Sequence, residues 1–71
     1  MQELISIITP MFNSEKFIES AIKSIQDQTY QNWEIIIIDD ASIDRSAKIA
    51  ESFAVKDERI KVIKLESNKG P

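Results

Sequence analysis

The sequence predicts an α/β fold in which three parallel strands alternate with two helices, in the order β-α-β-α-β. Three observations predict it: short β-branched runs, a helix-length segment after each of the first two runs, and four consecutive isoleucines at residues 35–38. An unbroken apolar run of this kind is typical of a parallel strand that is buried on both faces. Two acids, Asp39 and Asp40, directly follow it.

The first strand is expected at residues 4–8, because the run is β-branched and Pro10 lacks the N–H group that a strand ladder needs. The second strand is expected at residues 33–38. The third is expected at residues 60–65, where apolar residues are interrupted by two lysines.

Each helix is expected to begin at a residue whose side chain can accept a backbone N–H bond. Asn13 or Ser14 serves the first helix, which should end between residues 26 and 28, and Ser42 or Asp44 serves the second. Apolar residues at helical spacing should form the inward faces. They are Phe17, Ile18, Ala21, Ile22 and Ile25 in the first helix, and Ile43, Ala47, Ala50, Phe53 and Ala54 in the second.

If both crossovers step the same way along the sheet, their right-handedness gives the order 3-2-1 and brings both helices to one face. The other face is then bare, although residues 35–38 direct isoleucines to both faces. We therefore expect residues 1–71 to be the first part of a larger domain that covers this face. The alternative is a small assembly module that forms a homodimer through it.

Composition excludes several classes of protein. The chain has no cysteine and no histidine, so neither a disulfide scaffold nor a Cys/His metal site is available. A net charge of -3 disfavours nucleic acid, whose binding depends on Lys and Arg replacing counterions. No segment approaches the roughly 20 apolar residues of a membrane span.

The candidate site lies at the carboxyl ends of the first two strands, where open parallel sheets bind their ligands. An aromatic face can stack on a nucleobase, and a carboxylate can accept its N–H group or a ribose hydroxyl. The candidate residues are Thr9, Pro10, Phe12, Asn13, Asp39 and Asp40. Alternatively, Phe12 packs against the first helix, Asn13 is a turn residue and one acid merely ends the strand. Because consecutive side chains diverge, only one of the two acids should face a ligand.

Three familiar phosphate or cofactor sites do not fit. Residues 9–14 lack the glycines of a dinucleotide-binding or Walker-type loop. A magnesium pocket of the phosphate-receiver type would want its acid pair after the first strand, whereas Asp39 and Asp40 follow the second. No cluster of Arg or Lys is expected beside this loop, so a metal held by acids further along is the remaining way to neutralise a diphosphate.

Several segments in order resemble the start of family 2 glycosyltransferases: residues 5–13, 24–30, 34–44 and 57–60, extending to residues 68–70. The resemblance implies a GT-A fold, whose nucleotide-binding half is Rossmann-like. It also implies transfer of a sugar from a nucleotide diphosphate sugar, most simply a UDP-sugar, to a glycan or lipid-linked acceptor.

Carried over by resemblance, Pro10 and Phe12 would line the base pocket, with Phe12 stacking and Asp40 binding the base. Phe12 stands where tyrosine is commoner in the family. Thr9 and Asn13 would shape the loop, with Asn13 near the nucleotide. Gln28, Thr29 and Tyr30 would be structural.

The resemblance also implies a divalent metal, Mn or Mg, held by a D-x-D-type motif, and a later carboxylate base. Neither motif occurs in residues 1–71. We therefore expect no catalytic and no metal-binding residue in this segment, and no transfer activity from it alone. The full-length protein is expected to be cytoplasmic and membrane-associated.

Overall fold

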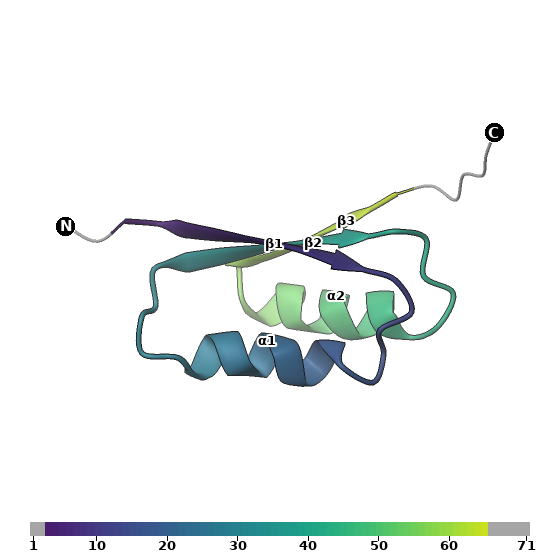
Figure 1. Ribbon diagram of the computed structural model, residues 1–71, viewed down its shortest axis with the longest axis horizontal. Coiled ribbons are helices and arrows are strands. Elements are labelled where there is room, and N and C mark those ends of the chain that lie inside the picture. The colour runs from purple at the N-terminus through teal and green to yellow at the C-terminus, as the bar shows by residue number, and fades with distance from the viewer. Residues whose placement is uncertain (1–2, 66–71) are drawn as a thin grey trace.

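The computed structural model describes residues 3–65, which form a parallel sheet and a layer of two helices. The elements are β1 (Ile5–Met11), α1 (Ile18–Asp27), β2 (Trp33–Asp39), α2 (Ser46–Lys56) and β3 (Ile60–Lys64). The strands are parallel in the order β1-β2-β3, which is the predicted order read from the opposite edge. Both helices cover the same face of the sheet, as predicted (Figure 1).

The strand register brings the carboxyl ends of β1 and β2 level with each other. Met11, the last residue of β1, is paired with Asp39, the last residue of β2. The loops after both strands therefore leave the sheet at the same end, and each leads directly into a helix. This end is where a ligand of an open parallel sheet would bind.

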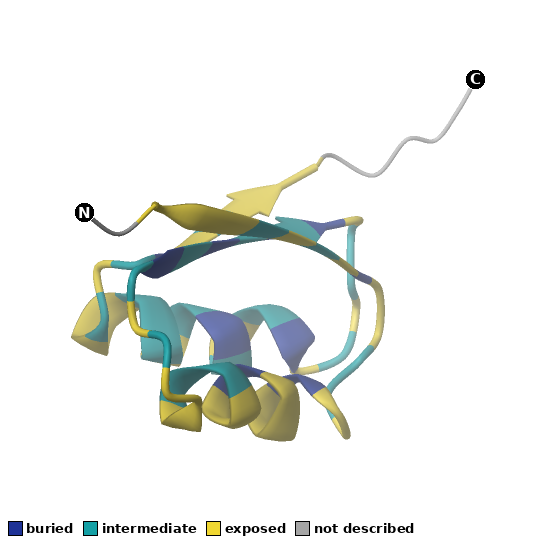
Figure 2. Ribbon diagram, turned by 60° about the vertical axis from the view of Figure 1, so that its left-hand side comes forward, coloured by how far each residue is buried: buried dark blue, intermediate teal, exposed yellow. Residues whose placement is uncertain are grey.

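The hydrophobic core lies between the sheet and the two helices (Figure 2). Ile35 and Ile37 of β2 point into it and are buried, whereas the alternate residues Ile36 and Ile38 point to the other face and are only half-buried. Ile8 and Ile63 are exposed. The full set of buried apolar residues is Met11, Ile18, Ile22, Trp33, Ile35, Ile37, Ala50 and Ile60. The predicted bare apolar face is thus present.

The first strand is longer than the sequence predicted, since β1 continues through Pro10 to Met11. β1 is an edge strand, and Ile5 donates its N–H to the backbone oxygen of Asn32, just before β2. Every second N–H after Ile5 points the same way, so the nitrogen of Pro10 faces the free edge, where proline costs no ladder bond.

Both helices begin later than predicted, and three apolar residues assigned to their inward faces are exposed: Phe17, Ala21 and Ile43. α1 begins at Ile18 and α2 at Ser46, so Phe17 and Ile43 precede the helical turns. Phe17 is 70% exposed and Ile43 is 90% exposed. The helical spacing of apolar residues in the sequence extends beyond the first residue of each helix. Phe17 and Ile43 lie in the non-helical turns before the helices, and the backbone there directs their side chains into solvent.

The opposite end of the sheet is closed by Trp33, the first residue of β2, which is only 1% exposed. The Arg59 guanidinium lies 3.7 Å from the centre of the Trp33 ring and forms an ion pair with Asp57 at 2.9 Å. Arg59 also donates to the backbone and side-chain oxygens of Gln31. The Tyr30 hydroxyl donates to the backbone oxygen of Glu3, in keeping with the structural role expected for this segment.

The longer helix of the described part, α2, has 11 residues. Within residues 3–65, neither helix has the length and apolar character needed to cross a membrane.

Candidate functional site

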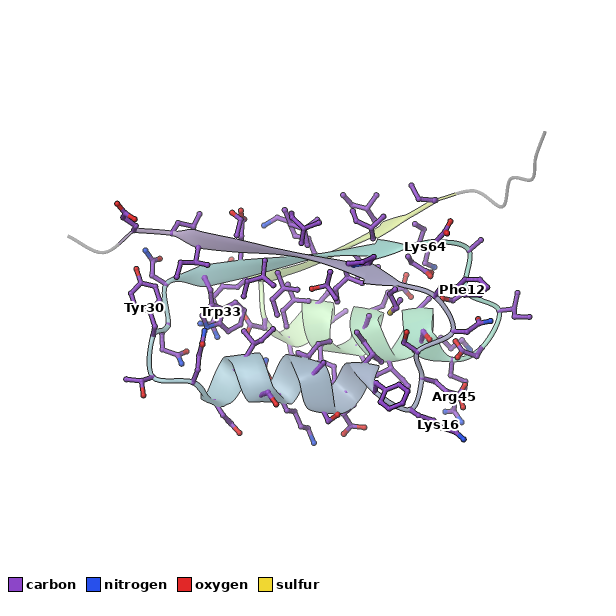
Figure 3. All side chains as sticks on the ribbon, viewed as in Figure 1. Phe12, Lys16, Tyr30, Trp33, Arg45 and Lys64 are labelled. Atoms are coloured by element: carbon purple, nitrogen blue, oxygen red, sulfur yellow. The ribbon has the colours of Figure 1, made fainter. Side chains whose placement is uncertain are left out.

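Two loops form the candidate site, at the end of the sheet where β1 and β2 finish. Residues 12–17 lead from β1 to α1, and residues 40–45 lead from β2 to α2. The loops start side by side, because Asp40 donates its N–H to the backbone oxygen of Met11 at 2.9 Å. Phe12 lies at this end of the sheet and Trp33 at the other (Figure 3).

The two adjacent acids have different surroundings, as the alternation of a strand requires. Asp39 is the last residue of β2, is 3% exposed and accepts a hydrogen bond from the N–H of Ser42 at 3.1 Å. Asp40 is exposed. Within residues 3–65 its carboxylate forms no hydrogen bond or ion pair. Asp40 is therefore the acid that faces solvent, and Asp39 is held inside the turn.

Thr9 and Pro10 lie within β1 and not in the loop that follows it, which corrects the expected boundary. Thr9 shares the helix-covered face with Met11 and is half-buried, while Pro10 lies on the bare face and is exposed. Both stand next to the loop, but neither belongs to its exposed part.

Phe12 is 59% exposed, so it does not pack into the core beneath α1 as the alternative interpretation required. Its aromatic ring is available to a ligand. The next residue, Asn13, has a left-handed backbone with φ of 49°. Among residues other than glycine, asparagine adopts this conformation most readily.

Five hydrogen bonds join the two loops, one of them through Ser46 at the start of α2, across sequence separations of 29 to 32 residues. In each of them a backbone N–H on one side donates to a side chain on the other. We call this set the rim clamp. Its donor and acceptor pairs are Asn13 N–H to Ser42 Oγ, Ser14 N–H to Ser46 Oγ, Glu15 N–H to Asp44 Oδ2, Ile43 N–H to Asn13 Oδ1 and Arg45 N–H to Glu15 Oε1.

The predicted helix caps were wrong, because the N-caps are Phe17 in α1 and Arg45 in α2, and neither side chain forms a capping bond. Asn13, Ser42 and Asp44 instead take part in the rim clamp, and Asp44 Oδ1 also accepts the N–H of Ser46 at 2.9 Å. Ser42 accepts a bond from the other loop, as does Glu15. Residues so distant in sequence show no shared pattern, so no signal in the sequence identified these pairs.

Hydrogen bonding also lowers the pKa of Asp44. Desolvation raises the pKa of this carboxyl group, but bonds from the side chain and backbone of Ser46 and from the backbone of Glu15 together bring it below its ordinary value. Asp44 therefore remains an ionised acceptor for both loops at neutral pH.

Three cationic side chains lie toward this end of the molecule: Lys16, Arg45 and Lys64 (Figure 3). The expectation that no cluster of Arg or Lys lies beside the loop stays a prediction. Lys64 forms an ion pair with Glu51 at 2.8 Å, and this hydrogen bond and charge raise the pKa of its ammonium group. Lys16 and Arg45 lie just before the two helices. Because α1 and α2 run in the same direction, their first residues lie at the same end of the sheet. The positions of Lys16 and Arg45 could therefore have been inferred from the sequence.

The described residues do not fit a metal ion by themselves. Residues 3–65 contain no group of three or more acidic side chains placed closely enough to hold one. They also form no enclosed pocket, so the candidate site is an open rim between two loops.

The chain matches the family model "Glycosyl transferase family 2" over residues 6–71, and it belongs to that family. It is 44% identical over 70 residues to the glycosyltransferase GlyG of Streptococcus pneumoniae serotype 4, covering 99% of this chain and 23% of GlyG. It is 43% identical over 67 residues to the putative teichuronic acid biosynthesis glycosyltransferase TuaG of Bacillus subtilis, covering 94% of this chain and 27% of TuaG. The chain thus spans about a quarter of these relatives.

Two solved structures share the fold. The S. aureus protein TarS 1–349 in complex with UDP has a TM-score of 0.77 and 32% sequence identity, covering 94% of this chain and 20% of that one. The mannosyltransferase PcManGT from Pyrobaculum calidifontis in complex with GDP-Man and Mn²⁺ has a TM-score of 0.79 and 21% identity, covering 94% and 21%. The chain therefore has the α/β fold of part of a GT-A glycosyltransferase.

Proposed function

We propose that this chain binds the nucleotide of a nucleotide diphosphate sugar, most simply a UDP-sugar, in an enzyme that transfers the sugar to a glycan or lipid-linked acceptor. One observation carries the proposal. An exposed aromatic ring, Phe12, and an exposed carboxylate without a partner in the described part of the chain, Asp40, stand on adjoining loops at the carboxyl ends of neighbouring strands. The UDP in TarS and the GDP-Man in PcManGT support a nucleotide as the ligand.

Five of the six candidate residues have a defined part in this proposal. Phe12 stacks on the base, and Asp40 accepts a hydrogen bond from a base N–H or a ribose hydroxyl. Pro10 borders the base from the exposed edge of β1. Thr9 acts from within the strand, supporting the loop. Asp39 keeps the turn after β2 closed through its bond to Ser42.

Residues 3–65 contain no group of three or more acidic side chains close enough to hold a metal ion. We propose that the ligands of Mn or Mg, and the base that activates the acceptor, belong to the remainder of the whole protein. A divalent metal there would neutralise the leaving diphosphate. The chain alone then binds nucleotide without transferring sugar, and we expect the whole protein in the cytoplasm, associated with a membrane.

Titration of the folded chain with UDP, followed by backbone amide shifts, tests the proposal. We expect shifts at residues 9–13 and 39–42 that do not depend on Mn²⁺. GDP is titrated in parallel, since the sequence does not set the base preference. A folded sample that responds to neither nucleotide would contradict binding by this part of the enzyme.

The bare sheet face supports a second candidate function, an assembly module that forms a homodimer. Ile8 and Ile63 are exposed there, beside the half-buried Ile36 and Ile38. Exposed apolar surface of this kind commonly marks an interaction site. The mass of the chain in dilute solution tests this function, which requires a dimer that Ile36→Lys converts to a monomer. A wild-type monomer would exclude it.

A further inference from the structure

The rim clamp engages five backbone N–H groups of the two loops, residues 12–17 and 40–45. The N–H groups of Asn13, Ser14, Glu15, Ile43 and Arg45 donate across the gap between the loops. Those of Ser42 and Ser46 donate on their own side of the gap, to Asp39 and Asp44. These N–H groups therefore stabilise the two loops and are not available to donate to a ligand.

The bonds of the clamp differ in how close they are to the candidate ligand residues. Asn13 directly follows Phe12, and its partner Ser42 is two residues after Asp40. The bonds donated by the N–H groups of Ser14 and Glu15 are part-buried, whereas both bonds of Asn13 are exposed. The bond from Arg45 to Glu15 is also exposed, but it lies further along both loops from Phe12 and Asp40. Asn13 is thus the clamp residue nearest the open part of the rim.

Asn13 both donates a hydrogen bond to the other loop and accepts one from it. Its N–H donates to Ser42 Oγ at 2.9 Å, and its Oδ1 accepts the N–H of Ile43 at 2.9 Å. Its left-handed backbone turns the chain immediately after Phe12, and Ala41, with φ of 59°, does the same immediately after Asp40. Two turns joined by two reciprocal bonds fix how far Phe12 stands from Asp40.

We infer that Asn13 is a positioning residue, which holds Phe12 and Asp40 at the separation that a nucleobase requires. This inference rests on the proposed nucleotide site. Asn13 acts through the bond from Ile43 N–H to its side-chain oxygen, without itself touching the base. Pre-organised loops bind more tightly because the ligand does not have to order them.

Two substitutions separate the hydrogen bond from the backbone conformation. Asn13→Gly accepts a positive φ but lacks the side-chain oxygen, whereas Asn13→Asp keeps an acceptor oxygen and tolerates the same φ. The matched control is Ser52→Ala, which removes a side-chain bond to the backbone oxygen of Ile49, away from the rim. All variants are measured at high salt, which screens the negative charge that Asn13→Asp adds.

The readouts are the dissociation constant for UDP and the urea midpoint of the full chain. We expect Asn13→Gly to weaken UDP binding about three- to tenfold with a nearly unchanged urea midpoint. Asn13→Asp should restore most of the affinity, and Ser52→Ala should bind as the wild type does. Rescue of affinity at constant stability is a result that a merely structural role would not give.

Failure of the inference is distinguishable from failure of the proposed function. If the wild type binds UDP and Asn13→Gly binds it equally well, the positioning role is overturned while the nucleotide site remains. Affinity lost only in step with the urea midpoint also overturns it. If the wild type binds neither UDP nor GDP, the nucleotide site itself fails, and the inference fails with it.

Discussion

Both ends of the sheet carry aromatic, charged and polar side chains, but these side chains form different kinds of contact at each end. At the end near Trp33, charged side chains pair with each other, and Arg59 covers the indole ring while it binds Asp57. At the other end, the polar side chains of the rim clamp bind backbone N–H groups, which leaves Phe12 and Asp40 exposed. The polar groups near Trp33 thus stabilise the fold. At the other end, hydrogen bonds hold the two loops together and leave the Phe12 ring and the Asp40 carboxylate available to a ligand.

The largest effect should come from breaking the closed end at Trp33. Trp33→Ala removes a ring that is 1% exposed, and we expect it to lower the free energy of unfolding by about 3–5 kcal/mol. Phe12→Ala removes a ring that is 59% exposed and should change it by less than about 0.5 kcal/mol. Urea unfolding followed by circular dichroism gives both values. Equal losses would remove the distinction between the ends.

The second largest effect should separate the two neighbouring acids. Asp40→Asn removes the exposed carboxylate and should weaken UDP binding about tenfold or more, with little change in stability. Asp39→Ala leaves the N–H of Ser42 without its acceptor and should cost about 1–2 kcal/mol of stability. Calorimetric titration and urea unfolding are measured on both variants. If both variants bind UDP as tightly as the wild type does, neither carboxylate contributes to nucleotide binding.

A smaller effect is expected at Ala41, whose left-handed backbone is costly for alanine. Ala41→Gly should raise the free energy of unfolding by up to about 1 kcal/mol, because glycine adopts a φ of 59° without steric conflict. The control Ala47→Gly, within α2, should instead lower it by about 1 kcal/mol. The same urea series measures both. A destabilised Ala41→Gly would contradict the backbone strain inferred at this turn.

The smallest effect concerns the response of the closed end to acid. Hydrogen bonding from Arg59 lowers the pKa of Asp57 from 3.8 to about 2. Because the folded-state pKa is depressed, this group stabilises the fold above about pH 4, and the contribution is lost as the pH falls through about 2. In Arg59→Met, the pKa of Asp57 should return toward its ordinary value, as a carboxyl carbon NMR titration would show. An unchanged pKa would mean that Arg59 is not the cause.

The sequence predicted the sheet well because its signals are local. Four isoleucines and the two other apolar runs located the strands, and right-handed crossovers that step the same way along the sheet gave their order. The helix starts were less well predicted, since the turns before Ile18 and Ser46 depend on side chains some 30 residues away. Phe17 and Ile43 were misassigned for the same reason.

The candidate site was predicted in outline. The rule for parallel sheets brought the six candidate residues to one end, and the alternation of β2 explains why Asp39 is buried and Asp40 exposed. Extending the strand by one residue would have assigned these two acids from sequence alone. The bonds of Asn13 to Ser42 and Ile43 could not have been assigned in this way, because they join loops that no local pattern relates.

The most direct test of the central claim is whether the base of UDP contacts Phe12. Intermolecular nuclear Overhauser effects between uracil protons and aromatic side-chain protons would identify the contact in the bound state. We predict effects to the Phe12 ring and none to Phe17, which belongs to the same loop and is even more exposed. Effects to Phe17 with none to Phe12 would contradict the account.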